Sequence, residues 1–155
     1  MHTIVACSTP PGQSGIAIVR LSGSTVKKII QKITQKKVPT AKTPTLFSLY
    51  DNKKVFDQAI ITYYKKGHSY TGEDLIEISC HGNPIIINKI IDLSLQAGAK
   101  IAEAGEFTKR SFLNGKISID QAESVSSLIH AKSDLGVRLS ANNLHGELGR
   151  SLRKI

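Results

Sequence analysis

The chain has 155 residues, of which 40% are hydrophobic and 21% charged, a composition typical of one soluble globular domain with a hydrophobic core. Its apolar runs, such as residues 85–87, are far too short to cross a bilayer, and residues 1–20 lack the cationic and apolar segments of a secretory signal. We therefore expect a cytoplasmic protein with no membrane segment. Cys7 and Cys80 match no metal or redox spacing, and we interpret them as reduced core thiols.

The net charge of +9 is concentrated in the first half of the chain. Residues 1–72 hold 11 Lys/Arg and 2 Asp/Glu, whereas residues 73–155 hold 10 of each. Such an asymmetry can mark a surface that meets phosphate groups. The excess of 16 Lys over 5 Arg also fits AT-rich codon usage, and no Lys/Arg cluster is interleaved with aromatic residues as a base-stacking surface would be. Both interpretations stay open from the sequence.

Residues 1–117 alternate predicted strands and helices, which indicates an α+β domain. Strands are expected at 3–7, 15–21, 45–50, 55–64 and 74–80, with a short one at 99–102. Two prolines and a glycine stiffen the segment 8–14 between the first two strands, and residues 51–54 are a plausible hairpin turn. Three helices are expected. The first begins at Ser24, and the third covers residues 106–113. The second has Asn83 as its N-cap and Pro84 at its first position, and it ends at Gly98.

The pattern changes beyond Ser118. Residues 120–155 predict helix almost throughout, with a broken apolar seam that Gly136, Gly146 and Gly149 weaken. A lone amphipathic helix cannot bury its own apolar stripe. We therefore expect residues 118–155 to be the first helices of a truncated helical domain, whose partners lie outside this chain or in a second copy of it.

Four short motifs follow one another along the chain. They are residues 9–20 (TPPGQSGIAIVR), residues 70–74 (YTGED) running on to Glu77 and His81-Gly82, residues 105–116 (GEFTKRSFLNGK) and residues 120–123 (DQAE). In this order and spacing they resemble the MnmE (TrmE) family of tRNA modification GTPases, from the first residues of the chain to its end.

The resemblance implies a fold, a reaction and partners. It implies an N-terminal α+β domain similar to the folate-binding aminomethyltransferase of the glycine cleavage system, then a helical domain that carries an inserted Ras-like G domain. Family members are homodimers that work with the flavoprotein MnmG (GidA). Together they install carboxymethylaminomethyl-type groups at C5 of the wobble uridine of tRNA, with a tetrahydrofolate such as 5-formyltetrahydrofolate bound by the N-terminal domain.

The GTPase part of that family is not encoded in these residues. No G-x-x-x-x-G-K-[ST] motif occurs, and the one Gly-Lys pair, Gly115-Lys116, is followed by Ile117. Without backbone amides that cradle phosphate and a hydroxyl for magnesium, this chain is expected not to hydrolyse GTP. GTP, Mg²⁺ and K⁺ are expected only in the absent G domain.

The resemblance places the family's folate-binding residues at Arg20, Glu77 and Lys116. The residue types suit a reduced folate, because a carboxylate can accept the row of N–H groups on the pterin edge and cations suit the carboxylate tail. Each also has a plain structural reading, since Arg20 and Glu77 sit on predicted strands and Lys116 in a turn, where all three could simply face solvent. We assign no catalytic residue and no metal ligand, and we interpret residues 81–84 as a structural helix start.

The sequence is compatible with three other functions. One is a stand-alone aminomethyltransferase relative, which the short chain and the DQAE motif disfavour. Another is a basic RNA-binding module, which a steep salt dependence of tRNA binding would favour. The third is a dimerisation domain with a degenerate pocket, because Gln13 and Ser14 stand where many relatives have more basic or glycine-rich residues.

Overall fold

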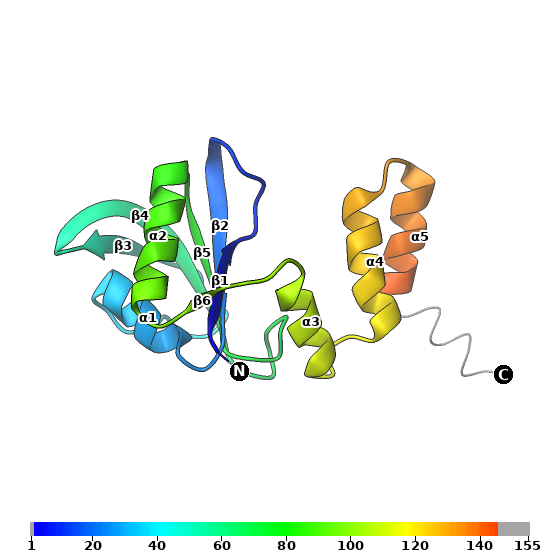
Figure 1. Cartoon of the computed structure of the whole chain (residues 1–155), viewed down its shortest axis with the longest axis horizontal. Helices are drawn as coiled ribbons and strands as arrows, with labels where there is room; N and C mark the ends of the chain where they lie inside the picture. Colours follow the sequence, from blue (N-terminus) through cyan, green and yellow to red (C-terminus); the bar gives the residue numbers. More distant parts are fainter. Residues whose placement is uncertain (1, 146–155) are drawn as a thin grey trace. The chain divides into compact units, whose positions relative to one another are not determined.

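The computed structural model describes residues 2–145. The chain divides into two compact units, with bounds Met1–Phe107 and Thr108–Ile155. The first unit is built on a six-stranded sheet with strand order β3-β4-β5-β2-β1-β6 (Figure 1). Its strands are β1 (Ile4–Cys7), β2 (Ser14–Ser22), β3 (Thr45–Asp51), β4 (Lys54–Tyr64), β5 (Leu75–Gly82) and β6 (Lys100–Ile101). All neighbouring strands are antiparallel except β1 and β6, which are parallel. The predicted α+β class is confirmed.

Helices α1 (Val26–Thr34) and α2 (Pro84–Gln96) pack on the same face of this sheet (Figure 1). Alternate residues of the strands meet them, as the two-residue period of a strand requires. Leu21 of β2, Ile78 of β5 and Ile29 of α1 are fully buried in the shared core. Burying each such side chain contributes about 1.5–3 kcal/mol, so this layer holds the sheet and helices together.

The remaining side chains of the strands project from the opposite face of the sheet, which we call the outer face. Arg20, Glu77 and Thr62 lie beside one another on it, because Arg20 pairs with Glu77 across β2 and β5 and Thr62 pairs with Glu77 across β4 and β5. At the end of β5, Gly82 faces Ser14 of β2 so closely that any side chain there would meet the Ser14 carbonyl and hydroxyl.

Local signals set the ends of these elements where the sequence predicts them. The turn between β3 and β4 places Asn52 and Lys53 at φ of 46° and 66°, the left-handed conformation that two-residue hairpin turns need. The Asn83 side chain accepts a hydrogen bond from the Ile85 N–H at 2.8 Å, with Pro84 at the first position of α2. Helix α3 (Glu106–Leu113) begins and ends as predicted.

The second unit holds α4 (Ile119–His130) and α5 (Asp134–Leu144). The prediction of helix almost throughout from residue 120 holds for the described residues, with one short break at Ala131, after which Ser133 caps the second helix through its hydroxyl. The two helices pack against each other, and the Gln121 side-chain amide donates to the Leu144 carbonyl at 2.7 Å. Part of the predicted seam, including Gly146 and Gly149, lies outside the described residues.

The paired helices still leave apolar side chains in contact with solvent. Within the described part of the second unit the exposed large apolar residues are Phe112, Leu113, Ile119, Ile129, Leu135, Val137 and Leu139. The helical hairpin therefore buries part of the seam internally and leaves the rest without cover from this unit.

Candidate functional site

Arg20 and Glu77 form a close charge pair on the outer face of the sheet. The Arg20 Nε and Nη2 atoms both donate to the Glu77 Oε1 atom, at 2.9 Å and 2.7 Å. The two residues are 57 positions apart in sequence and meet because β2 and β5 pair in this register. Their side chains are 29% and 24% exposed, so the pair is shielded from solvent and still reachable.

Aromatic side chains lie next to this pair. The Tyr64 hydroxyl is 3.4 Å from the Glu77 Oε2 atom, and the Arg20 guanidinium carbon is 6.0 Å from the centre of the Phe107 ring. Burial raises the pKa of the Tyr64 phenol above its ordinary value, and the negative charge of Glu77 raises it further. Both Arg20 donors converge on Oε1, so among residues 2–145 the Oε2 atom has only the long contact with Tyr64 and can accept hydrogen bonds from a ligand.

An apolar row crosses the outer face beside the pair. Leu46 pairs with Ile60 across β3 and β4, Ile60 pairs with Ser79 across β4 and β5, and Ser79 pairs with Ile18 of β2. Leu46 is 63% exposed and Ile60 is 46% exposed. The Arg20–Glu77 pair therefore adjoins apolar surface that the first unit leaves in contact with solvent.

Lys116, the third predicted binding residue, belongs to the second unit. It follows Gly115, which has a φ of 66°, and its backbone N–H donates to the Ser111 carbonyl at 2.9 Å, which closes the C-terminal end of α3. The Lys116 side chain is exposed. The backbone N–H of Lys116 is used by the turn, so a binding role of Lys116 would involve its side chain.

A second polar contact, not predicted from the sequence, joins β4 and β5. The buried Asp57 carboxylate contacts the Nδ1 atom of His81 at 2.6 Å and accepts the His81 backbone N–H at 3.2 Å. Burial, reinforced by the Asp57 charge, raises the pKa of the neighbouring Cys80 thiol to about 11, so Cys80 is a poor nucleophile at neutral pH. The Asp57–His81 contact fixes the end of β5 just before α2 and agrees with a structural role for residues 81–84.

Asp74 links three segments at the other end of β5. It accepts hydrogen bonds from the Tyr63 hydroxyl at 2.7 Å and the Lys66 N–H at 2.8 Å, and it lies 3.6 Å from the Lys27 ammonium group. Burial alone would raise the pKa of this carboxyl. The two hydrogen bonds and the Lys27 charge outweigh burial and hold the pKa of Asp74 below its ordinary value.

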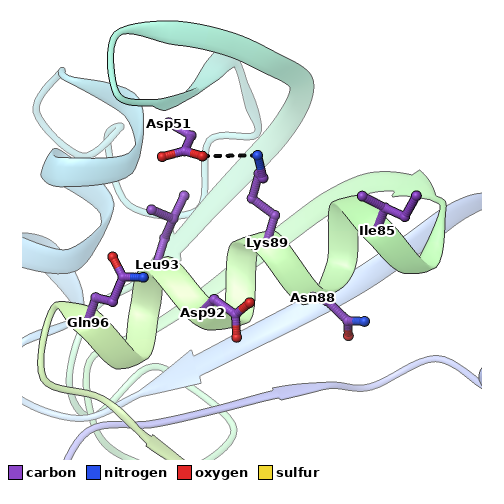
Figure 2. A pocket seen from close by; sticks show the side chains of 7 residues that line it. All are labelled: Asp51, Ile85, Asn88, Lys89, Asp92, Leu93 and Gln96. Carbon is purple, nitrogen blue, oxygen red and sulfur yellow. Dashed lines mark hydrogen bonds and ion pairs between the residues drawn. The ribbon is translucent and has the colours of Figure 1, made fainter.

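Two hollows of the first unit lie away from the pair. Figure 2 shows one of about 350 Å³ between the end of β3 and the exposed side of α2, where the Lys89 ammonium group contacts the Asp51 carboxylate at 2.9 Å. A second of about 350 Å³ lies between Cys7, the loop that holds Pro11, and Ile87 of α2. Neither is lined by Arg20 or Glu77.

Among residues 2–145, no helix has the length and apolar character that crossing a bilayer requires. The same residues contain no group of three or more His, Cys, Asp or Glu side chains arranged to hold a metal ion.

Comparison with known proteins decides the family. Residues 3–116, most of the chain, match the family model described as the GTP-binding protein TrmE N-terminus. The chain belongs to the TrmE family. Its relatives include the tRNA modification GTPase MnmE of Thermotoga maritima, 46% identical over 149 residues, and that of Aquifex aeolicus, 46% identical over 154 residues. MnmE of Francisella tularensis subsp. holarctica is 41% identical over 153 residues.

These alignments cover nearly all of this chain and a third of each TrmE-family relative. They include 96% of the chain and 33% of the Thermotoga maritima protein, and 98% of the chain and 34% of the Aquifex aeolicus protein. The relatives are GTPases by name, and the chain corresponds to their N-terminal region. This agrees with the lack of a phosphate-binding G-x-x-x-x-G-K-[ST] motif in its sequence.

Proposed function

We propose that this chain is the tetrahydrofolate-binding and dimerising region of a cytoplasmic tRNA modification GTPase. In this proposal the whole protein works with a flavoprotein partner, MnmG, to install carboxymethylaminomethyl-type groups at C5 of the wobble uridine. GTP, Mg²⁺ and K⁺ act in a G domain that these residues do not contain. The observation that carries the proposal is the Arg20–Glu77 pair, whose two members come from different family motifs and meet at one point of the sheet.

The chemistry of the pair fits a reduced folate such as 5-formyltetrahydrofolate. The Glu77 Oε2 atom is the acceptor for the N–H groups of the pterin edge, and the Arg20 N–H groups that do not contact Glu77 remain for an anionic or carbonyl group of the ligand. Tyr64 and Phe107 supply aromatic surface for a flat ring. Lys116 is the proposed cationic contact from the second unit.

Arg20 also tunes the carboxylate that it contacts. An isolated Glu77 anion would lose hydration when a flat ligand covers it, which is costly in a partly dry site. The guanidinium already compensates that charge, so the carboxylate can accept the pterin N–H groups with a smaller desolvation cost. The fold implied for this arrangement is one similar to the folate-binding aminomethyltransferases.

The outer face of the sheet is also the proposed interface of the homodimer. The partly exposed pair lies on the same face as the exposed apolar residues Leu46 and Ile60, and a bound folate there needs further cover. A second copy of the chain buries such a row and closes the site, and a two-fold dimer is the commonest closed assembly. The exposed apolar residues of the helical hairpin provide further surface for association.

Calorimetric titration of the 155-residue chain with 5-formyltetrahydrofolate tests the proposal. Saturable binding that Arg20→Ala and Lys116→Ala each weaken is the expected result, with sedimentation of the same sample showing a dimer. A chain that forms a dimer and binds no folate would leave the dimerisation role and refute the folate site. A monomer at tens of micromolar that also binds no folate would refute both.

A further inference from the structure

Seven exposed lysines gather on the surface made by α1 and two neighbouring loops. They are Lys28, Lys32, Lys36, Lys37, Lys42, Lys65 and Lys66, and we call this group the lysine surface. Backbone contacts bring its segments together. The Lys42 N–H donates to the Tyr63 carbonyl at 2.8 Å, next to the loop that holds Lys65, and the Lys66 N–H donates to Asp74, which also lies 3.6 Å from Lys27 of α1.

The ammonium groups of the lysine surface outnumber the carboxylates next to them, which are Glu73 and Asp74 beside Lys66. Residues 1–50 contain no Asp or Glu at all. Within residues 2–145, none of the seven ammonium groups forms a salt bridge. The Asp74 carboxylate pairs with Lys27, which is not one of the seven. A concentration of like charge of this kind raises the energy of the isolated chain and is relieved when an anionic partner binds.

The geometry of α1 favours a polyanion over a lipid bilayer. Lys28 and Lys32 lie one helical turn apart, about 6 Å along the axis, on the solvent side of the helix. The apolar side of α1 is committed to the core, because Ile29, Ile30 and Ile33 are at most 1% exposed. An amphipathic helix that binds membranes by insertion places such a side in the lipid, and α1 has none to offer.

We propose that the lysine surface binds the phosphate backbone of RNA. The RNA is the tRNA substrate of the proposed function, and this inference rests on that proposed function for the identity of its partner. Lysines act as point charges on phosphate groups and read no bases, so the contact is independent of sequence and orients the tRNA. The affinity comes largely from release of counterions from the phosphates.

The test is the salt dependence of tRNA binding by the 155-residue chain, measured by fluorescence anisotropy with labelled tRNA. The test variant is the triple substitution Lys28→Gln, Lys32→Gln and Lys36→Gln, which removes charge and keeps good helix formers on α1. The control is a second triple substitution of equal charge at exposed sites elsewhere in the first unit, Lys53→Gln, Lys54→Gln and Lys100→Gln.

Each phosphate contact contributes about 0.7–0.9 to the slope of log affinity against log salt concentration, so three lost contacts should lower the slope by about 2–3. We expect the test variant also to bind tRNA at least about tenfold more weakly at low salt, and the control to lose far less. Equal affinity and slope in the two variants would overturn the proposal.

Two further measurements separate the remaining outcomes. Vesicles containing phosphatidylserine probe a membrane partner, and lysine-dependent binding to them without tRNA binding would overturn the proposal in favour of a lipid surface. Absence of binding to either probe would also overturn it. Titration of the test variant with 5-formyltetrahydrofolate should match the parent chain, so that failure of the folate site is not mistaken for failure of the lysine surface.

Discussion

Replacement of Glu77 by alanine is the sharpest test of the folate site. The parent carboxylate presents Oε1 to Arg20 and keeps Oε2 for a ligand. Hydrogen bonds that involve a charged group contribute about 1.5–3 kcal/mol each. Loss of one such bond to the pterin edge should therefore weaken 5-formyltetrahydrofolate binding by about tenfold to a hundredfold.

Two further variants show which part of the carboxylate matters. Glu77→Gln keeps an acceptor for Arg20 but turns an amide N–H₂ group toward the N–H groups of the ligand, so we expect it to lose most of the affinity. Arg20→Ala combined with Glu77→Ala should lose less than the sum of the single losses, because each single variant leaves the other charge without its partner. Residues in contact commonly couple by about 0.5–3 kcal/mol in such cycles.

Calorimetry on variants of this same chain provides the measurement, and Glu103→Ala, an exposed carboxylate in the first unit, provides the control. The control should bind folate like the parent chain. The reasoning is refuted if Glu77→Ala also binds like the parent while its melting temperature is unchanged. The dimerisation role would then be the better account of this region.

Three other predictions concern the surroundings of the site. Asp74→Asn should lower the free energy of unfolding near pH 6, and the difference from the parent chain should shrink as pH falls below about 4. The reason is that a carboxyl with a depressed pKa stabilises the fold only while it is ionised. A difference that stays constant in acid titrations of unfolding would contradict this. Leu46→Glu with Ile60→Glu should shift the dimer toward monomer in sedimentation, and an unchanged dimer would place the interface elsewhere. Gly82→Ala should cost about 1–3 kcal/mol in chemical denaturation because its side chain crowds the facing strand, whereas Gly15→Ala, with open space around it, should cost far less.

Local chemistry made much of the fold predictable. The Asn83 cap and the hairpin turn depend on residues next to one another in the chain, and both are confirmed. The prediction of helix almost throughout from residue 120 agrees with α4 and α5 over the described residues. Apolar periodicity does not locate the break between them, although Ser133, a good N-cap, is a local signal for it.

The candidate site shows where sequence reasoning stops. Arg20 and Glu77 were chosen from the family resemblance, each for its own role. Their direct contact depends on the register between β2 and β5, which no local pattern specifies. The Asp57–His81 contact was missed for the same reason, since it joins two strands whose pairing brings together residues 24 positions apart. Whether Lys116 joins the site stays a prediction.

The fold separates the two proposed binding surfaces. Helix α1 packs on one face of the sheet and turns its lysines to solvent, whereas the Arg20–Glu77 pair projects from the other face. Sites without shared contacts act independently to within about 0.3–0.5 kcal/mol. A variant that combines Glu77→Ala with Lys28→Gln, Lys32→Gln and Lys36→Gln should therefore lose folate affinity as Glu77→Ala does and tRNA affinity as the triple variant does. If folate binding changed the tRNA affinity of the parent chain by more than about tenfold, about 1.4 kcal/mol, the two ligands would be coupled through this domain and the separation by the sheet would be the wrong description.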